Sequence, residues 1–380
     1  MDSMSEEPTV QAKPGLEGVV AGDTAICCVE QGTLTYRGYA IGDLAGKVCF
    51  EEVAHLLLFQ ELPTEAELKD FRKVLDSHRG LPKPVVDALR TIPPAVPMMD
   101  VLRTGVSMMG HFDPISGHTQ DDLWERSICL LAVVSDIVSA RFRLKNGQSP
   151  LQPKPGLSHA AQFLYVCHGT EPDATATQVL DLTLILYAEH EFNASTFTDR
   201  VIASTMSDMV SAVVGAIGAL KGPLHGGANE QAMQLILRFK TAAEASKWVN
   251  EALARKEKVM GFGHRVYKHG DHRAHILEEK MRELAVQKGR QDLLAVYDAI
   301  KTPIVSKKNP IYPNVDYPCG MTYFLLGLPL DLFTPLFVCS RITGWCAHFI
   351  EQQQNNRLYR PLSQYVGPAT RPVVPIEGRG

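Results

Sequence analysis

The sequence predicts an all-α fold in two domains, with one short β-hairpin near the N-terminus. Helical periodicity recurs along most of the 380 residues. Only residues 26–38 carry the composition of paired strands. The alternation of strands and helices that builds a parallel sheet is absent from the pattern. At roughly 100 to 200 residues per domain, the chain is long enough for two or three domains.

The clearest predicted helix follows Pro63. Residues 64–67 read Thr-Glu-Ala-Glu, which is a capping box, and apolar residues then recur every three or four positions until Gly80. The same periodicity predicts further helices, which lie at about 50–60, 98–110, 120–144, 157–168, 174–189, 207–220, 228–239, 243–256, 273–300 and 333–355. The hairpin is expected at 26–38, with Gly32 in its turn.

Two breaks in this pattern suggest the domain organisation. A glycine-rich segment lies near 218–227 and a proline-rich one near 301–320, and a charged helical stretch lies between them. Such a stretch is typical of an inserted domain with a hinge at each end. We therefore expect a large helical domain made of residues 1–221 and 331–380, and a small domain made of residues 222–330.

Composition excludes several classes of protein. The 38 Lys and Arg against 42 Asp and Glu give a net charge of −4, which does not favour nucleic acid or an anionic membrane. The N-terminus is acidic and has no signal-peptide pattern, and the apolar stretch 321–346 is interrupted by charged residues and prolines. We expect a cytoplasmic protein whose eight cysteines form no disulfides.

Four segments carry polar residues that a structural helix would not need. They are AEHEFNAST, GPLHGGAN, GFGHRVYKHGDHR and YPNVDYPCG, which start at residues 188, 222, 261 and 312. In the second and third, glycines flank a histidine, so the backbone can approach a ligand closely. Each segment alone could be a turn with locally bonded side chains. The four together indicate a functional site.

Other kinds of site match the spacing less well. His190-Glu191 begins like the HExxH zinc motif, but Ala194 stands where the second histidine is needed. A metal could use the histidine cluster at 264, 269, 272 and 275, in which only the last two share a helix face. GAIGALKG lacks the spacing of a phosphate loop.

The segments GPLHGGAN, GFGHRVYK, DHR and PNVD, in this order, resemble the signature of the citrate synthase family, including its 2-methylcitrate synthase branch. The resemblance runs from GLEGVVAGDTAI near the N-terminus to LYRPLSQYVGP near the C-terminus, so it covers nearly the whole chain. It implies a citrate-synthase-like fold, with a large and a smaller helical domain and the site between them. It also implies a homodimer with shared active sites.

The resemblance implies a transferase that condenses acetyl-CoA with oxaloacetate and hydrolyses citryl-CoA to citrate and CoA, as in the tricarboxylic acid cycle. No permanently bound cofactor is implied, because the coenzyme A thioester is a substrate. Three alternatives stay open. They are a 2-methylcitrate synthase that uses propionyl-CoA, a non-catalytic helical scaffold, and a metal hydrolase that uses the histidine cluster.

Three residues match the family's catalytic groups. Asp316 matches the base that takes a proton from the thioester methyl group. His225 matches the donor to the thioester oxygen, and His264 matches the histidine that protonates the oxaloacetate carbonyl. From the residues alone, Asp316 could instead cap a helix that begins after Pro318.

The expected substrate contacts also follow from the resemblance. Guanidinium groups suit the two carboxylates of oxaloacetate, and the matching ligands are His190, Arg273, Arg341 and Arg360. Arg360 would reach the neighbouring subunit's site. Each arginine could equally be a surface ion pair. The coenzyme A contacts match Lys258, Val259, Met260, Gly261, Phe262, Gly263 and Lys268, and Lys307 and Lys308 are candidates for the phosphates.

The chain departs from the family pattern after the base. Many relatives carry a serine where this chain has Cys319, so a small residue is kept and its hydroxyl is lost. This change leaves the chemistry intact and puts the detail of the acyl pocket in doubt. Cys319 as a nucleophile would not fit the family's chemistry, which uses no covalent intermediate.

Overall fold

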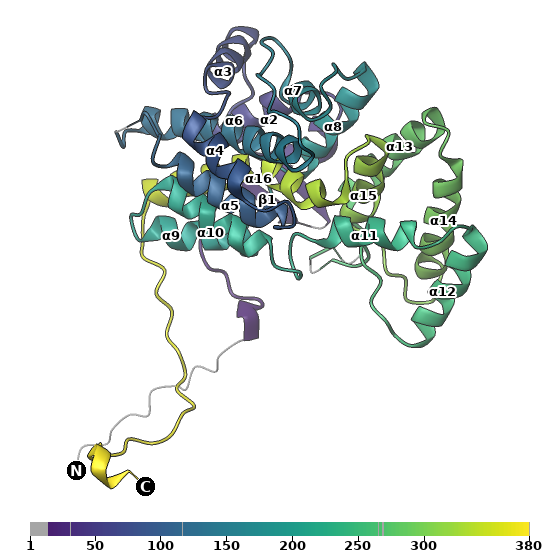
Figure 1. Ribbon diagram of the computed structural model, residues 1–380. Helices are drawn as coiled ribbons and strands as arrows, with labels where there is room; N and C mark the ends of the chain where they lie inside the picture. Colours follow the sequence, from purple (N-terminus) through teal and green to yellow (C-terminus); the bar gives the residue numbers. More distant parts are fainter. Residues whose placement is uncertain (1–13, 31, 116, 265, 268–269, 380) are drawn as a thin grey trace. The chain divides into compact units, whose positions relative to one another are not determined.

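The computed structural model describes residues 14–379 except 31, 116, 265, 268 and 269. It is mostly helical with one small sheet (Figure 1), so the predicted all-α fold class is confirmed. The first ten helices are α1 Ile41–Leu44, α2 Phe50–Phe59, α3 Glu65–Ser77, α4 Lys83–Thr91, α5 Met98–Met109, α6 Gln120–Lys145, α7 His159–His168, α8 Ala174–Tyr187, α9 Ala194–Ser204 and α10 Met209–Leu220. The others are α11 Ala228–Leu237, α12 Ala242–Ala254, α13 His272–Gln287, α14 Gln291–Val305, α15 Asp316–Leu325 and α16 Phe333–Gln354.

The predicted hairpin is present. Strands β1 Cys27–Glu30 and β2 Thr33–Tyr36 pair antiparallel, with Cys27 opposite Tyr36. Gly32 has φ +82°, the left-handed conformation that the turn needs. A third strand, β3 Tyr39–Ala40, which the pattern did not predict, extends the sheet.

The predicted capping box is also present. The Glu67 amide donates to the Thr64 hydroxyl, and the Glu67 carboxylate accepts from the Thr64 amide at 2.8 Å. Helix α3 therefore begins at the residue that the sequence indicated.

The prediction of one helix over 273–300 was wrong. The chain forms α13 and α14 instead, and between them Gly289 takes φ +68°, a conformation that ends a right-handed helix. Residues 287–292, Gln-Lys-Gly-Arg-Gln-Asp, carry no apolar side chain, so the sequence itself held a signal for this break. Helices α1, α4 and α9 were not predicted. Helix α15 entered only as the alternative in which Asp316 caps a helix after Pro318, and it begins at Asp316 itself, with Pro318 and Gly320 near its start.

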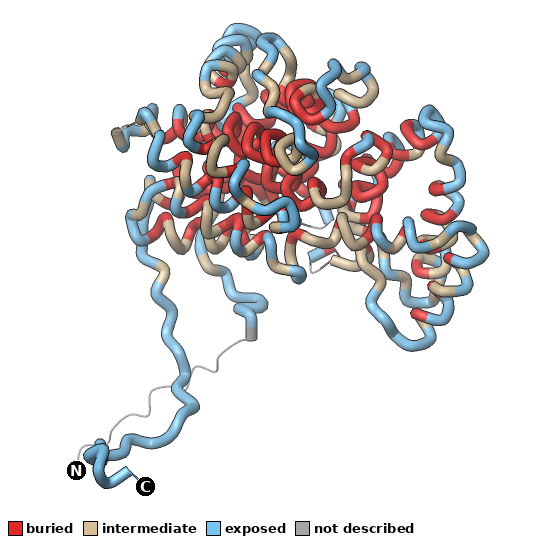
Figure 2. Tube along the Cα trace, in the orientation of Figure 1, coloured by how far each residue is buried: buried red, intermediate tan, exposed pale blue. Residues whose placement is uncertain are grey.

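The core is centred on two long helices, α6 and α16, which pack on each other. Most of α16 is buried on all sides, from Phe333 through Ile350. Figure 2 shows the buried residues concentrated around α2, α6 and α16, while the helices at the periphery expose one face. These central helices give a rigid base for the side chains described below.

Helices α11 to α15 form a group of their own in Figure 1. Helix α12 packs on α14, and both α11 and α13 pack on α15. The group meets the rest of this part of the chain where α13 and α15 contact α8, and where α11 contacts α16. The predicted catalytic residues lie close to these contacts.

The chain divides into two compact units, one of residues 24–357 and one of the two terminal segments, 1–23 and 358–380. The described part of the terminal unit is mostly exposed and holds two short 3₁₀ helices, Pro14–Leu16 and Ile376–Gly378. None of the helices in the described ranges is long and apolar enough to cross a bilayer. All eight cysteines are free thiols.

Candidate active site

Asp316 is the first residue of α15. Its Oδ1 accepts a hydrogen bond of 2.6 Å from the hydroxyl of Tyr187, the last residue of α8. Its amide donates to Asn314 Oδ1 at 3.1 Å. The helix has no side-chain N-cap bond at its N-cap residue, Val315. The carboxylate therefore faces a neighbouring helix and does not cap its own.

Burial raises the pKa of Asp316 to about 6, because the charged carboxylate loses water. The Tyr187 hydrogen bond and the positive charge of Arg273 oppose this rise. A carboxyl group with this pKa is mostly ionised at neutral pH, yet it is a stronger base than an ordinary aspartate. These are the properties of a general base.

The hydrogen bonds of His264 define its tautomer. Its Nδ1 accepts from the amides of Val266 at 3.1 Å and Tyr267 at 3.2 Å. An amide can only donate, so in the neutral ring the proton lies on Nε2. The ring stacks on Tyr267 with centroids 4.6 Å apart and lies edge-on to His190 at 5.1 Å.

His190 is buried beside this pair. Its Nε2 lies 3.0 Å from the Tyr267 hydroxyl. Burial lowers the pKa of His190, and the positive charges of Arg273 and Arg341 lower it further. The ring is therefore neutral, and it lies among the groups that the sequence assigned to oxaloacetate.

His225 lies between α10 and α11 and contacts α9. Its Nε2 accepts from the Ser195 amide at 3.3 Å and lies 2.9 Å from the Ser195 hydroxyl. Trp345 Nε1 donates to the same hydroxyl at 3.2 Å, which fixes the serine. Burial lowers the pKa of His225 to about 4. The ring is therefore neutral, with its proton on Nδ1, and it can serve as a donor.

Arg341, on α16, is a buried cation. Its Nε donates to the Tyr187 carbonyl at 2.8 Å, and its guanidinium lies 4.8 Å from the Phe337 ring centroid. Within the described ranges it forms no ion pair and its two terminal nitrogens donate no hydrogen bond, although the charge of buried Glu189 raises its pKa against the effect of burial. A buried charge without a partner is costly. The surroundings of Arg341 therefore favour an anionic ligand.

Arg273 differs from Arg341 because its charge is already paired. Its Nε and Nη2 donate to the two oxygens of Asp271 at 3.0 and 2.9 Å. Asp271 also accepts from the amide of Val315, next to Asp316. Asp271 therefore connects residues 271–273 to residues 312–315, the loop that precedes Asp316. The role of Arg273 as a ligand of oxaloacetate stays a prediction.

The predicted coenzyme A segment pairs with the loop of the base. The Gly263 amide donates to the Tyr312 carbonyl at 2.8 Å, and the Asn314 amide donates to the Gly261 carbonyl at 2.9 Å. The Gly263 amide is therefore already bonded within the protein, and the coenzyme A contacts given to Gly261 and Gly263 stay predictions. Lys258 is exposed, Val259, Met260 and Phe262 are partly buried, and their contacts with coenzyme A stay predictions.

Two further residues were predicted to contact the substrates. Lys268 lies outside the described residues. Arg360 belongs to the terminal unit, where its exposed side chain donates to the Pro361 carbonyl at 3.4 Å. The roles given to both residues stay predictions. Lys307 and Lys308 lie after α14, and their contacts with the phosphates of coenzyme A stay predictions.

The metal interpretation is not supported. Over the described ranges, no three His, Cys, Asp or Glu side chains lie close enough to hold a metal ion. His272 and His275 are exposed, and His269 lies outside the described residues.

Sequence reasoning missed three residues of the site, namely Tyr187, Ser195 and Asp271. Ser195 and Asp271 lie inside segments that were singled out, but their partners are distant in sequence. Tyr187 ends an apolar helix just before one of those segments. A buried tyrosine needs a partner for its hydroxyl, which was the available signal.

Comparisons with known proteins identify the family. A family model described as citrate synthase, C-terminal domain, matches residues 15–362. A 2-methylcitrate synthase of Corynebacterium glutamicum is 45% identical and covers 97% of this chain and 99% of its own length. A citrate synthase of Mycolicibacterium smegmatis is 42% identical over 98% of this chain and 100% of its own.

Solved structures of citrate synthases have the same fold as this chain, at lower sequence identity. The citrate synthase of Pyrobaculum aerophilum has a TM-score of 0.90 and 38% identity, covering 98% of this chain and 100% of that one. A citrate synthase from Thermoplasma acidophilum, solved with carboxymethyl coenzyme A and oxaloacetate, has a TM-score of 0.92 and 34% identity, covering 97% and 100%. The fold and the matches define an all-α synthase of the citrate synthase type. The chain belongs to the citrate synthase family.

Proposed function

We propose that the protein condenses a short acyl-CoA, acetyl-CoA in the first place, with oxaloacetate and hydrolyses the product to citrate and coenzyme A. The observation that supports this most directly is the buried Arg341 beside His190 and Asp316, a cation that forms no ion pair with any described residue, although the charge of buried Glu189 acts on it. A carboxylate of oxaloacetate would complete this charge. The solved relative bound to oxaloacetate and a coenzyme A analogue supports the same assignment.

In the first step Asp316 takes a proton from the methyl group of the thioester. The negative charge moves to the thioester oxygen, where the Nδ1–H of neutral His225 donates a hydrogen bond. Such a donor is worth about 3 to 4 kcal/mol in the transition state, and a positioned base about 10²- to 10⁴-fold in rate. Because the pKa of His225 is lowered to about 4, the ring stays a neutral donor throughout the working pH range.

In the second step the enol carbon attacks the ketone carbon of oxaloacetate. The new carbon–carbon bond moves an electron pair to the ketone oxygen, which takes a proton from Nε2 of His264. Water then hydrolyses the resulting citryl-CoA, which releases citrate and coenzyme A. His190 and Arg341 would hold the oxaloacetate carboxylates during both steps.

Propionyl-CoA is the second candidate for the acyl substrate. Relatives named 2-methylcitrate synthase are 43 to 45% identical to this chain, while those named citrate synthase are 40 to 42% identical. One added methylene in a pocket changes preference by only about 1 to 3 kcal/mol. The ratio of kcat/KM for the two thioesters, measured at the same oxaloacetate concentration, distinguishes the candidates.

The assembly and the domains belong to the same proposal. We propose a cytoplasmic homodimer in which Arg360 contributes to the neighbouring subunit's site, and a small domain of residues 222–330 that closes over the substrates. The separate packing of α11 to α15 supports the second part. The homodimer is tested by measuring the mass of the protein in solution. The role of Arg360 is tested by the activity of a mixed dimer that carries Arg360→Ala in one subunit.

The direct test is thiol release from acetyl-CoA or propionyl-CoA, followed with a thiol-reactive dye. Release should require oxaloacetate, so omitting it separates condensation from simple thioester hydrolysis. A chelator should leave the rate unchanged. If neither thioester releases thiol in an oxaloacetate-dependent way, the proposed function is wrong.

A further inference from the structure

The end of α8 and the start of α15 meet at one hydrogen bond. Tyr187 closes α8, Asp316 opens α15, and the phenol donates to Oδ1 at 2.6 Å. Burial raises the pKa of Tyr187 well above its ordinary value, so the phenol keeps its proton and acts as the donor. We infer that Tyr187 is a positioning residue for the proposed base, Asp316, and that it fixes which carboxylate oxygen takes the substrate's proton.

The two oxygens of Asp316 are not equivalent. Oδ1 is occupied by the phenol, whereas Oδ2 accepts no hydrogen bond from any residue that the structure describes. A carboxylate can rotate between two nearly equal arrangements unless one oxygen is held. With Oδ1 held, Oδ2 is the oxygen left to accept a proton. The phenol also stabilises the charged form of the carboxylate, and so it limits the rise in pKa that burial causes.

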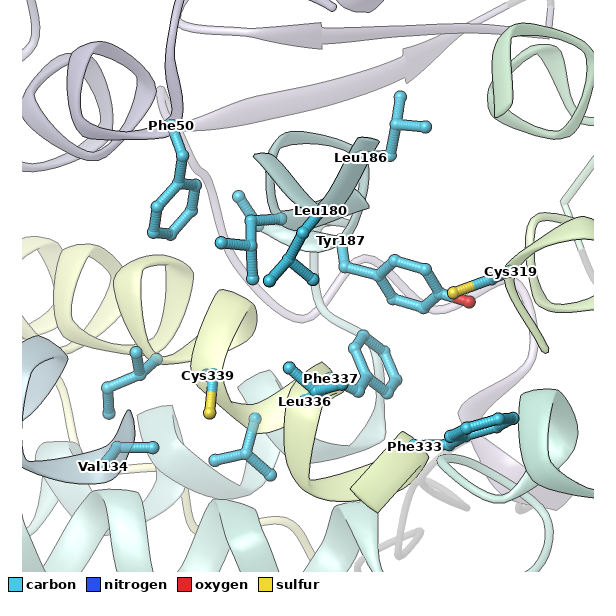
Figure 3. Packing of buried hydrophobic residues seen from close by; sticks show 14 of the residues in the cluster. Phe50, Val134, Leu180, Leu186, Tyr187, Cys319, Phe333, Leu336, Phe337 and Cys339 are labelled. Atoms are coloured by element: carbon cyan, nitrogen blue, oxygen red, sulfur yellow. The ribbon is translucent and has the colours of Figure 1, made fainter. Parts of the chain in front are cut away.

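Tyr187 is itself held from three sides. Its carbonyl accepts from Arg341 Nε at 2.8 Å, and Phe337 packs edge-on against its ring with centroids 4.6 Å apart. The Cys319 thiol lies beside its hydroxyl (Figure 3). Burial raises the pKa of Cys319, so this sulfur stays a thiol and not a nucleophilic thiolate. The phenol is therefore aimed at Asp316 by neighbours on α15 and α16.

The inference rests on the proposed function, in which Asp316 is the base. Tyr187→Phe keeps the ring and removes only the donor, so the packing against Phe337 is preserved. The acid limb of the kcat/KM profile, expected near pH 6 in the parent, should move up by about one unit, because hydrogen bonds to charged acceptors are strong. At the plateau kcat should fall about tenfold, with KM for both substrates within about threefold.

Two controls separate this role from a structural one. Tyr323→Phe is the same change on α15, the helix that Asp316 opens, in a ring that packs against Phe333, and it should leave the profile in place. In an Asp316→Asn background, Tyr187→Phe should add almost no further loss, because the residue acts through the carboxylate. If Tyr187→Phe lowered kcat by the same factor in the parent and in the Asp316→Asn variant, the inference would be contradicted.

A measurement without turnover makes the result independent of the proposed reaction. In protein labelled with ¹³C at the aspartate carboxyl, the resonance that disappears in Asp316→Asn belongs to this residue. Its titration midpoint should rise in Tyr187→Phe and fall when position 187 carries 3-fluorotyrosine, whose more acidic phenol is a stronger donor. An unchanged midpoint in both proteins overturns the inference, whereas a parent without oxaloacetate-dependent thiol release overturns the proposed function instead.

Discussion

At the scale of single residues, the site consists of charged and polar groups that the fold holds away from water. Arg341 is buried and Asp316 is partly buried, and each has at least one side of its functional group without a hydrogen-bond partner among the described residues. Such groups destabilise the free protein, and they are retained where a substrate supplies the missing partner. Substitutions at these two positions should therefore change stability and activity in opposite directions.

Asp316→Asn tests this opposition. Asparagine keeps the shape and can still accept from Tyr187, but it cannot take a proton, so kcat should fall by at least about 10²-fold with oxaloacetate affinity nearly unchanged. Stability should rise at neutral pH. An acid whose pKa moves from 3.8 to about 6 on folding destabilises the folded state above pH 6, by up to about 3 kcal/mol.

The pH dependence gives the sign of this effect. Below pH 3.8 the carboxyl group is protonated in both the folded and the unfolded state, so the variant and the parent should differ little in Tm. The difference should grow as pH rises through the interval up to about 6 and then level off. A thermal unfolding series from pH 3.5 to 8 measures it, and a variant that is less stable than the parent at pH 8 would contradict the assignment.

Arg341→Lys is the matching test at the substrate side. Lysine keeps the charge but loses the planar fork and the Nε bond to the Tyr187 carbonyl. We expect KM for oxaloacetate to rise by about tenfold or more, and the KM for the thioester to change less. Isothermal titration with oxaloacetate alone checks the binding part. A variant with unchanged oxaloacetate affinity would remove Arg341 from the site.

The residue scale also shows what the sequence could not predict. Asp316, His225 and His264 could be proposed as catalytic residues because each lies in a short motif that resembles the family's signature. Tyr187 could not, because its partner is 129 positions away and no local pattern records the contact. Asp271 was missed for the same reason, since it is bonded to Val315 through the tertiary structure.

At the scale of elements, two loops act as one unit. The segment 261–263 pairs with 312–314 through backbone hydrogen bonds and one bridge, Phe262 opposite Pro313. Both Gly261 and Gly263 have positive φ, at +84° and +80°. A Cβ at Gly261 would lie 2.9 Å from Tyr317 Cβ, whereas one at Gly263 would meet only Ile311, at 3.4 Å. A side chain at either position would therefore meet the same backbone strain, but only a Cβ at Gly261 would press on Tyr317.

This pair allows a matched test of the loop. Both Gly261→Ala and Gly263→Ala should cost about 1 to 2 kcal/mol for the left-handed backbone. Gly261→Ala should cost more, and it should also lower kcat, because it pushes against the residue that follows Asp316. Tm and kcat measured side by side check this expectation. Equal effects of the two substitutions would show that the packing on Tyr317 does not position the base.

Most elements followed from local pattern, and the exceptions have physical reasons. Capping residues and apolar periodicity predicted α3 and the long buried helices, because these signals lie in the local sequence and do not depend on contacts with distant residues. The break at Gly289 was missed although residues 287–292 interrupt the apolar stripe, so here the local pattern held a signal that the prediction did not use. Helix α15 entered only as an alternative because Pro318 and Gly320 disfavour a helix locally, and only its packing on α11 and α13 overrides them.

At the scale of the whole molecule, the candidate site depends on how two groups of helices meet. His264 lies in the segment before α13, Arg273 is the second residue of α13, and Asp316 opens α15. By contrast, His190 follows α8 and Arg341 lies on α16. Each substrate would therefore contact both groups. A ligand that bridges two bodies favours the arrangement in which they are close together.

Binding of the two substrates should therefore be coupled. Oxaloacetate, held by Arg341 on one side and His264 on the other, should draw the group α11 to α15 toward α8 and so organise the segment 258–263. We expect the affinity for coenzyme A, used as an unreactive probe, to rise at least about tenfold when oxaloacetate is saturating. Titration calorimetry with and without oxaloacetate measures this ratio.

Thermodynamic linkage sharpens the test. Saturating coenzyme A must raise the affinity for oxaloacetate by the same factor, so the two orders of addition check each other. Arg341→Lys should reduce both ratios together, because it weakens the contact through which oxaloacetate holds one of the two helix groups. Equal coenzyme A affinity with and without oxaloacetate would mean that the two groups of helices do not move on each other, and that residues 222–330 do not act as a closing domain.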